Sequence, residues 1–369
     1  MEYSPAALRR WPDLEGPDLP AADAADRLIL DESADARRDA GDGAVVVIGD
    51  GYGALALGAA SEGARGIRVH QDALTGEQAL AANAERFGLD GTFASQPLCA
   101  DLVAGARVVL LRLPRSLDAL RDLSGLIAAH AGADVVVYAG GRIKHMTPAM
   151  NDVLREHFSR VDVSHARQKS RVLIARGPHD GREPEPRIET HGDLAVCAFG
   201  GAFAGTSIDI GTRLLREHLP ERGAPAGSVI DLACGTGVVA TTLALRHPEL
   251  HVIACDQSAT AVASARATAE ANGVGDRVEV VRDDMLRSQG DATASFIALN
   301  PPFHVGAAVN DGVAPRMFAD AARVLQPGGE LWTVWNSALQ YRPALERLVG
   351  PTRQIARNAK FTLTASTRR

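Results

Sequence analysis

Short apolar runs alternate with longer stretches of helical spacing along the chain. Residues 44–48 and 228–232 are two such runs, and each leads through a glycine-containing turn into a helical pattern. Apolar runs of this length, bounded by turn residues, are typical of strands that are buried on both faces. Because strand and helix patterns alternate, the chain predicts an α/β fold with a parallel sheet covered on both faces.

The same succession of strands and helices occurs twice. Residues 44–54 match residues 228–238, and residues 69–89 match residues 254–274 at nearly the same spacing. Such self-similarity indicates an ancient duplication. Between the copies lies a polar stretch rich in glycine and proline, as expected of a linker. We therefore expect the following division: a first domain over 1–177, a linker over 178–198 and a second domain over 199–369.

The two copies differ in the polar residues at the ends of their strands. The second half carries Asp231, Asp256 and Asn300 at these places. Aligned on the glycines, the first half has different residues there: Val47, Gln71 (next to Asp72) and Arg112. The first half has kept the architecture and lost the polar residues, as a degenerate copy would.

Composition narrows the class of protein. At 369 residues the chain exceeds what one hydrophobic core usually supports, which agrees with two domains. It has no apolar run of membrane-spanning length and no secretory signal, and its four cysteines are scattered. We therefore expect a cytoplasmic protein without a membrane segment or a metal site. The net charge of −6 argues against non-specific coating of nucleic acid but allows a local basic face.

Gly235, Gly237 and Asp256 predict a nucleoside site in the second half. The two glycines follow a strand and open a helix, where the backbone can approach a ligand and the helix offers unpaired N–H groups. Asp256 ends the next strand, where a carboxylate can accept hydrogen bonds from both ribose hydroxyls. With Ala240, the glycines also fit a Gly-x-Gly-x-x-Ala dinucleotide motif. The motif indicates a nucleoside cofactor without saying which one.

Asp231 favours S-adenosylmethionine as that cofactor. It lies within the strand before the glycines, where a carboxylate suits the amino group of an amino-acid moiety and would repel a pyrophosphate. S-adenosylmethionine carries such an amino group. After the third strand pattern come Asp283 and Asp284. Asp284 is the first candidate acceptor for the adenine amino group, and a solvated acidic turn is the alternative.

Residues 300–304 read Asn-Pro-Pro-Phe-His and follow a buried apolar strand. Asn300, stiffened by Pro301 and Pro302, can offer its side-chain oxygen to a planar amine, and Pro301 can add its backbone carbonyl. Phe303 can stack on the ring that bears the amine. These acceptors would hold the amine by positioning, which needs no strong general base. His304 is a candidate base, with a loop-filling role as the alternative.

With these residues, the second half resembles class I S-adenosylmethionine-dependent methyltransferases of the small-domain group, which carry an Asn-Pro-Pro-aromatic signature. The whole chain is similar to the ribosomal RNA guanine-N2 methyltransferases that have two tandem methyltransferase domains, the first degenerate. Residues 300–304 and 203–212 carry this resemblance. Residues 140–148 and 166–171 resemble the large-subunit branch more than the small-subunit branch. Gly205 stands where the family usually has a basic residue.

The resemblance implies a fold, a reaction and a set of site residues. It implies two Rossmann-like domains with mostly parallel seven-stranded sheets, and methyl transfer from S-adenosylmethionine to the N2 amine of a guanine in ribosomal RNA, 23S before 16S. Phe203 is a second candidate wall of the base pocket, with core packing as the alternative. Asp209 is expected to cap a helix, and contact with the methionine moiety is the alternative. The expected catalytic residues are Asn300, Pro301, Pro302 and Phe303, and the expected cofactor-binding residues are Asp231, Gly235, Gly237, Asp256, Asp284 and Asn300.

Basic residues of the first domain predict contacts with RNA phosphates. They concentrate positive charge beside small residues, although a solvated charged surface is the alternative. The candidates are Arg142, Lys144, His145, Arg167, Lys169 and Arg171. We expect ribosomal RNA as the partner, naked or in a ribosomal subunit, and a monomer or weak dimer.

Other functions fit part of the pattern. Asn-Pro-Pro could also hold adenine N6, a protein glutamine or a small-molecule amine, although glutamine enzymes usually carry tyrosine in place of Phe303. An RNA-binding assembly factor could keep the cofactor site only as a fold element, but Asp231, Asp256 and Asn300 are all present. A dehydrogenase would need a catalytic acid or base beside the glycines, and none accompanies them.

Overall fold

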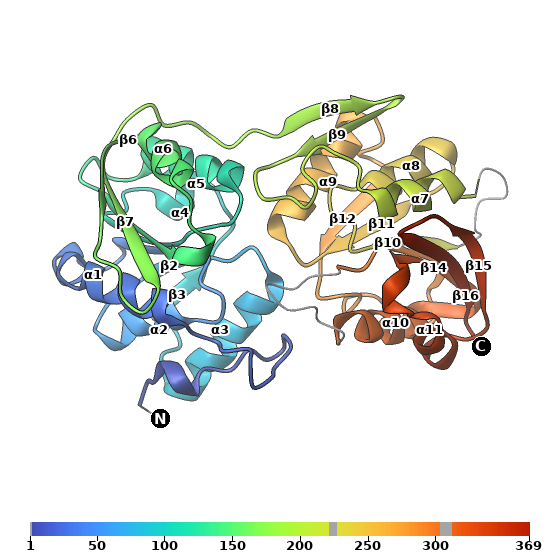
Figure 1. Ribbon diagram of the computed structural model, residues 1–369, viewed down its shortest axis with the longest axis horizontal. Helices are drawn as coiled ribbons and strands as arrows, with labels where there is room; N and C mark the ends of the chain where they lie inside the picture. Colours follow the sequence, from blue (N-terminus) through green and yellow to red (C-terminus); the bar gives the residue numbers. More distant parts are fainter. Residues whose placement is uncertain (1, 221–226, 303–311) are drawn as a thin grey trace. The chain divides into compact units, whose positions relative to one another are not determined.

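The computed structural model describes residues 2–220, 227–302 and 312–369 (Figure 1). They form two compact units, Met1–Glu185 and Pro186–Arg369. Each unit is built on its own sheet and has its own hydrophobic core. No helix among these described residues is long and apolar enough to cross a membrane.

The first unit alternates strands with helices, as its sequence predicts. Its strands are β1 (Val45–Ile48), β2 (Ile67–His70), β3 (Phe93–Ser95), β4 (Val108–Arg112), β5 (Val136–Arg142), β6 (Phe158–Val163) and β7 (Ser170–Pro178). Its helices are α1 (Ala24–Ala40), α2 (Ala54–Ser61), α3 (Leu74–Phe87), α4 (Ala100–Val103), α5 (Leu117–His130) and α6 (Ala149–Arg155), with 3-10 turns η1 (Pro5–Ala7) and η2 (Ile143–His145).

The second unit repeats this succession after a hairpin. Its strands are β8 (Arg187–His191), β9 (Leu194–Ala198), β10 (Ser228–Leu232), β11 (Val252–Asp256), β12 (Val278–Arg282), β13 (Ala294–Leu299), β14 (Leu325–Asn336), β15 (Thr352–Arg357) and β16 (Phe361–Thr367). Its helices are α7 (Ile210–His218), α8 (Val238–Arg246), α9 (Ala259–Ala271), α10 (Val313–Val324) and α11 (Arg342–Leu348), with the 3-10 turn η3 (Ser337–Leu339).

The two seven-stranded sheets have the same topology. The strand order is β3-β2-β1-β4-β5-β7-β6 in the first and β12-β11-β10-β13-β14-β16-β15 in the second. In each sheet the first five strands pair in parallel and the last two pair antiparallel. The expected α/β fold with two mostly parallel seven-stranded sheets is confirmed.

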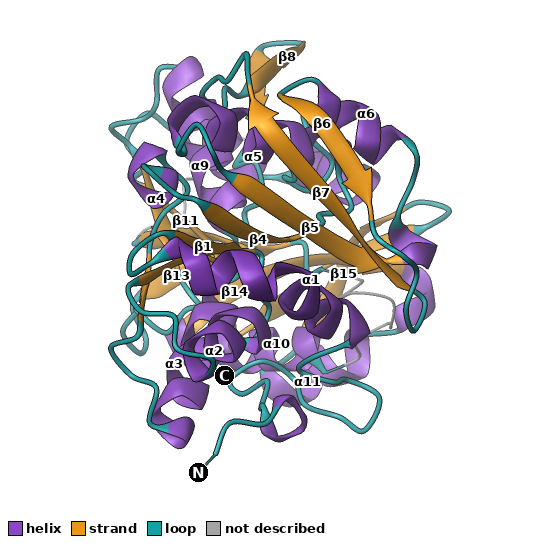
Figure 2. Cartoon of the chain, turned by 90° about the vertical axis from the view of Figure 1, so that its left-hand side faces the viewer, coloured by secondary structure: helices purple, strands orange, loops and turns teal. Residues whose placement is uncertain are grey.

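Helices cover both faces of the first sheet (Figure 2). Because successive side chains of a strand point to opposite faces, Val45 and Val47 pack with α1, α2 and α3, and Val46 and Ile48 pack with α4, α5 and α6. A strand that is buried on both faces has to be apolar throughout. This is why residues 44–48 form an unbroken apolar run.

The second sheet follows the same rule with one exception. Val229 of β10 packs with α7, α8 and α9, and Ile230 and Leu232 pack with α10 and α11. Asp231 lies two residues after Val229 in β10, so its side chain points to the same face of the sheet, the face that α8 covers. It is 3% exposed and stands where the first domain has an apolar residue. A buried carboxylate in a core strand is costly without polar partners, which marks this position as functional.

The expected linker over residues 178–198 contains β8 and β9, which pair as an antiparallel hairpin of the second unit. Side chains at the end of α9 complete the backbone hydrogen bonds of β9: Thr268 Oγ1 accepts from the Cys197 N–H at 3.0 Å, and Asn272, the C-cap residue, bonds both N–H and C=O of Ala195. The glycine- and proline-rich stretch at 177–186 is typical of a linker, but residues 187–198 are not part of it. Their alternating apolar and polar pattern and the turn at Gly192 are typical of a β-hairpin.

Candidate cofactor and substrate site

The expected site residues of the second unit meet at the carboxyl edge of its sheet. β10 pairs in parallel with β11 on one side and with β13 on the other, and Leu232 lies level with Cys255 and Leu299. Because the strands end at the same level, Asp256 and Asn300 lie on either side of the turn that follows β10. Ligands of open α/β sheets bind at this edge.

The turn after β10 is held open by its backbone conformation. Ala233, Gly235 and Gly237 all have positive φ, at 57°, 55° and 75°. A Cβ on Gly235 would meet nothing within 4 Å, whereas a Cβ on Gly237 would lie 2.9 Å from Ala265 Cβ on α9. The two glycines therefore differ in role: Gly235 leaves space above the turn, and Gly237 allows α9 to pack closely against it.

Asp256 ties this turn to the end of β11. Its Oδ2 accepts from the Gly235 N–H at 3.0 Å, and its Oδ1 accepts from the Ser258 N–H at 2.9 Å. These bonds fix the carboxylate beside the open face of the turn, where a ribose would lie. The geometry fits the nucleoside site that the sequence predicts.

Asp231 is a buried carboxylate with one protein hydrogen bond in the described structure. Its Oδ2 accepts from the Ala240 N–H at 2.9 Å, in the first turn of α8. Burial raises the pKa of Asp231 to about 7, the hydrogen bond from Ala240 opposes the shift, and the charge of Asp256 adds to it. A cation placed beside Asp231 would lower this pKa, which is what the amino group of S-adenosylmethionine would do.

The two acidic residues after β12 have different surroundings. Asp283 Oδ2 accepts from the Ser288 N–H at 2.8 Å and from its hydroxyl at 2.7 Å, so that this carboxylate closes its own turn. Asp284 is 4% exposed, and its Oδ2 lies 3.0 Å from Arg287 Nη2. Burial raises the pKa of Asp284, and Arg287 and Arg316 oppose the shift. Of the pair, Asp284 remains the candidate for an adenine contact.

The side-chain nitrogen of Asn300 has hydrogen-bond partners, whereas its side-chain oxygen has none among the described residues. Its Nδ2 donates to Thr212 Oγ1 at 3.0 Å and to Asp209 Oδ2 at 3.2 Å. Its Oδ1 is buried and has no partner among the described residues. A buried acceptor without a donor carries a desolvation penalty of roughly 1–3 kcal/mol, which a bound N–H group would remove. Phe303 and His304 lie outside the described residues.

Phe203 and Asp209 lie on the segment that leads into α7. The side chain of Phe203 is 71% exposed, so the core-packing alternative is wrong. Asp209 caps α7, with Oδ1 accepting from the Gly211 N–H at 2.8 Å and from the Thr212 N–H at 3.3 Å. The expected cap is confirmed. Its second contact, with Asn300, had no signal in the sequence, because 91 positions separate the two residues.

The corresponding edge of the first sheet is filled by the protein itself. Asp50 is buried and accepts from the N–H groups of Gly53, Leu55 and Ala56, the last at 2.8 Å. Ala56 stands three residues after Gly53 as Ala240 stands three after Gly237, so Asp50 takes the hydrogen bond that Asp231 takes in the second unit. The helix N-terminus that a ligand would use is therefore occupied.

Gln71 and Arg112 also occupy this edge of the first sheet with contacts inside the first unit. Gln71 Nε2 donates to the Gly51 carbonyl at 3.3 Å and also to that of Asp50. Arg112, at the end of β4, forms ion pairs with Asp23 at 2.9 Å and Asp26 at 2.8 Å at the start of α1. The residues that stand in place of Asp256 and Asn300 therefore make contacts inside the fold of the first unit.

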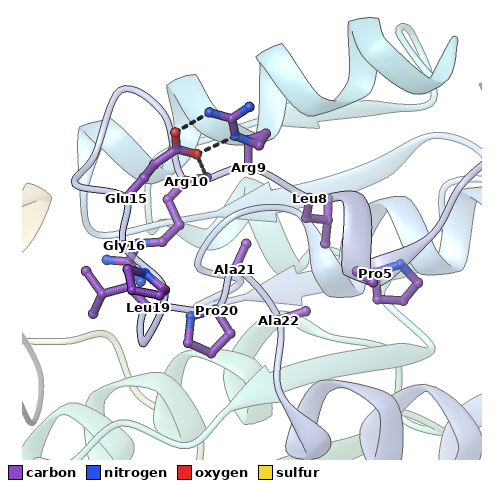
Figure 3. Close-up of a pocket in the computed structure, with 12 residues that line it drawn as sticks. Pro5, Leu8, Arg9, Arg10, Glu15, Gly16, Leu19, Pro20, Ala21 and Ala22 are labelled. Carbon is purple, nitrogen blue, oxygen red and sulfur yellow. Dashed lines mark hydrogen bonds and ion pairs between the residues drawn. The ribbon is translucent and has the colours of Figure 1, made fainter.

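The N-terminal segment covers the same turn of the first unit. Tyr52 donates to Asp13 Oδ2 at 2.5 Å, the guanidinium of Arg10 lies 4.4 Å from the Tyr52 ring centroid, and Asn83 on α3 bonds the backbone of Arg9. A cavity of about 400 Å³ lies within this segment, beside the ion pair of Arg9 and Glu15 (Figure 3). It contains none of the expected site residues.

The basic residues of the first unit come together at the carboxyl end of β5. Antiparallel pairing of β5 with β7 sets Arg142 opposite Ser170, and the Ile143 N–H donates to the Lys169 carbonyl at 2.9 Å. Partial desolvation and neighbouring cations, first Arg115, then Lys144 and Arg142, lower the pKa of His145. We call the set the basic edge; it comprises Arg115, Arg142, Lys144, His145, Arg167, Lys169 and Arg171.

Sequence reasoning missed two members of these sites. Arg115 follows β4 and joins the basic edge only because β4 and β5 are adjacent in the sheet. Thr212 lies in the first turn of α7, where its hydroxyl reaches Asn300. The helix-start signal at Asp209 could have drawn attention to α7, but nothing local in the sequence links α7 to β13.

The two halves of the chain match two known domain families. Residues 1–179 match the RLMG N-terminal domain, and residues 193–365 match the methyltransferase small domain. Ribosomal RNA large subunit methyltransferase G of Streptomyces avermitilis is 35% identical over 97% of this chain and 95% of its own length. Its counterpart in Pseudomonas aeruginosa is 35% identical over 96% of both.

A solved structure shares the two-unit fold. The T. thermophilus 16S rRNA guanine-N2 methyltransferase, determined with AdoMet and guanosine, superimposes with a TM-score of 0.73. It is 20% identical, and the match covers 88% of this chain and 88% of that one. The shared fold includes both units of the present chain.

The two glycines of the turn should respond differently to alanine. Gly237→Ala adds a left-handed penalty and a close contact with Ala265, and should lower the free energy of unfolding by about 2–4 kcal/mol. Gly235→Ala should cost about 1–2 kcal/mol and mainly weaken cofactor binding. Urea unfolding and calorimetric titration measure the two effects. Equal stability losses in the two variants would contradict the assigned roles.

Cofactor affinity should rise with pH because Asp231 must be ionised to hold an ammonium group. With a pKa of about 7, the dissociation constant of S-adenosylhomocysteine should fall about tenfold from about pH 6 to about pH 8. Asp231→Asn should bind weakly at both pH values. An equally pH-dependent affinity in this variant would exclude Asp231 as the titrating group.

The same shift has a consequence for stability. The folded-state pKa of Asp231 is raised above the ordinary value of 3.8, so the folded protein holds this proton more tightly than the unfolded chain does. The contribution of Asp231 to the free energy of unfolding of the ligand-free protein should therefore fall as the pH rises from the unfolded-state pKa of 3.8 to the folded-state pKa of about 7. Comparing pH-dependent urea unfolding of wild type and Asp231→Asn isolates the effect.

Proposed function

The chain belongs to the family of the ribosomal RNA large subunit methyltransferases G, and from this premise we propose that it methylates the exocyclic N2 amine of a guanine in 23S ribosomal RNA, with S-adenosylmethionine as the methyl donor. The observation that carries the proposal is the buried Oδ1 of Asn300, which has no partner in the described part of the chain and lies at the sheet edge that also holds Asp231 and Asp256. An amine that offers N–H groups satisfies this oxygen.

The residues present fit S-adenosylmethionine. Asp231 is a buried carboxylate suited to the amino group, Asp256 is placed for the ribose hydroxyls, and the space above Gly235 leaves room for the ligand. Asp284 would accept from the adenine amino group. When bound, S-adenosylmethionine supplies an electrophilic methyl group on a sulfonium.

Asn300 and Pro301 act on the amine. The lone pair of an exocyclic amine is delocalised into the ring, so the amine is a weak nucleophile until it is oriented. Asn300 Oδ1 and the Pro301 carbonyl would each accept one N–H, which turns the lone pair toward the methyl group. As positive charge develops on the nitrogen, the same two oxygens stabilise it. The extra proton then leaves to water.

The choice of substrate follows the family and the shape of the site. The relatives are named for the large ribosomal subunit, and the T. thermophilus neighbour is named for guanine N2 of 16S ribosomal RNA. The exposed ring of Phe203 precedes α7, where it can stack on a base that has left its helix. Phe303, which lies outside the described residues, is the other proposed wall, and the basic edge is the proposed contact for RNA phosphates.

The direct test supplies labelled S-adenosylmethionine to the protein with 23S or 16S ribosomal RNA, each naked and in its subunit, and identifies the labelled nucleoside. We expect N2-methylguanosine in 23S ribosomal RNA. Label confined to 16S ribosomal RNA would move the protein to the small-subunit branch. Label in N6-methyladenosine or in protein, and none in N2-methylguanosine, would overturn the proposal.

Removing the amide should abolish transfer and leave the cofactor in place. Asn300→Ala should lower kcat by about a hundredfold or more, with the dissociation constant of S-adenosylhomocysteine changed less than about threefold. Asn151→Ala, which removes a half-buried amide of the first unit that bonds only its own helix start, is the matched control. Retained turnover in Asn300→Ala would show that the motif is only a turn.

The basic edge should contribute salt-dependent RNA affinity. Lys144→Glu and Lys169→Glu should each weaken RNA binding and reduce the slope of log affinity against log salt by about one, while cofactor affinity stays unchanged. Arg38→Glu is the control, because Arg38 is an exposed cation in the last turn of α1 and is not part of the basic edge. An equal loss of RNA affinity in all three variants would show that the effect depends on net charge and not on the basic edge.

A further inference from the structure

Asn300 is held by a closed group of hydrogen bonds with α7. Asp209 Oδ1 accepts from the N–H groups of Gly211 and Thr212, and the Thr212 hydroxyl donates to Asp209 Oδ2. Asn300 Nδ2 donates to Thr212 Oγ1 at 3.0 Å and to Asp209 Oδ2 at 3.2 Å. One acidic side chain thus caps a helix and binds the amide of the proposed amine acceptor.

The chemistry of these partners decides which way the amide of Asn300 points. An amide can place either its oxygen or its nitrogen at a given position, and the two orientations are nearly equal in shape. An ionised carboxylate can only accept hydrogen bonds, and the single hydroxyl proton of Thr212 is already given to Asp209. Both groups therefore require a donor, which only Nδ2 provides. Oδ1 is left on the other side of the amide, where it is buried and has no partner within residues 2–220, 227–302 and 312–369.

We propose that Asp209 and Thr212 are positioning residues that fix Asn300 with its Oδ1 toward the reactive amine. The proposal rests on the methyltransferase function proposed above. A reversed amide would direct an N–H group at the substrate, where it would compete for the nitrogen lone pair and repel the N–H groups. The negative charge of Asp209 also polarises the amide, which makes Oδ1 a stronger acceptor.

The orientation matters most during the transfer itself. The nitrogen lone pair forms the new N–C bond while the S–C bond breaks and leaves its electron pair on sulfur, and the nitrogen then loses one proton to water. Between these events the nitrogen is cationic, and an oxygen beside it lowers the barrier. Gly211 keeps this oxygen uncrowded, because a Cβ there would lie 3.3 Å from Asn300 Oδ1.

The test uses substitutions that keep shape and the helix cap but change hydrogen-bond direction. Asp209→Asn can still accept from the Gly211 N–H, but its second position becomes a donor that favours the reversed amide of Asn300. We expect kcat to fall about tenfold to hundredfold. The Michaelis constant for RNA and the dissociation constant of S-adenosylhomocysteine should change less than about threefold.

Thr212 supplies a rescue series. Thr212→Val removes the hydroxyl at nearly constant volume and should lower kcat about tenfold. Thr212→Ser keeps the hydroxyl and should therefore keep kcat near the wild-type value. The cap control is Ser116→Ala, which removes the side-chain cap of α5 in the first unit, where Ser116 Oγ accepts from the Ala119 N–H at 3.2 Å. It should lower Tm and leave kcat unchanged.

The outcomes separate this proposal from the function on which it rests. Wild type without transfer to guanine N2 counts against the proposed function. Active wild type with an equally active Asp209→Asn variant overturns the positioning role. So does a loss of kcat in Asp209→Asn that is matched by an equal loss of cofactor affinity, because that result assigns Asp209 to the cofactor or to the cap alone. Reduced kcat with intact affinity and Tm supports the proposal.

Discussion

The parallel register of β10 with its two neighbours is the constraint on which the site depends. With Leu232 level with Cys255 and Leu299, the residues that follow β10, β11 and β13 must leave the sheet together. Backbone pairing thus brings a glycine turn, the carboxylate of Asp256 and the amide of Asn300 to one edge of the sheet. The side chains then decide what that edge can bind.

The first unit shows how much the side chains matter, because it has the same backbone constraint. There Asp50 bonds Ala56 N–H as Asp231 bonds Ala240 N–H, but it approaches from the turn and also bonds two further N–H groups. The N-terminal segment then clamps the turn through Tyr52. The sheet edge that is the proposed ligand site in the second unit is closed by the protein's own groups in the first.

Asp231 and Asn300 share one physical property: each keeps a polar group buried where the fold would prefer an apolar one. Burial raises the pKa of Asp231 to about 7, and Asn300 Oδ1 has no donor among the described residues. Both costs are borne by the ligand-free protein, and an ammonium group beside Asp231 and an amine N–H beside Asn300 would relieve them. The site is therefore complementary in charge and in hydrogen bonding to the ligands proposed for it.

The sequence by itself determined the α/β fold, the duplication and the strand-end acids and amide, because the periodicity of apolar residues and the glycine turns are local signals. It assigned the residues of β8 and β9 to a linker, whereas they form a hairpin whose strand β9 bonds Thr268 of α9 and Asn272, which follows that helix. Only the tertiary structure decided that Asp209 and Thr212 hold Asn300, and that Arg115 joins the basic edge. These contacts join residues that are far apart in the chain, and their geometry follows from strand order and helix packing, which no local pattern encodes.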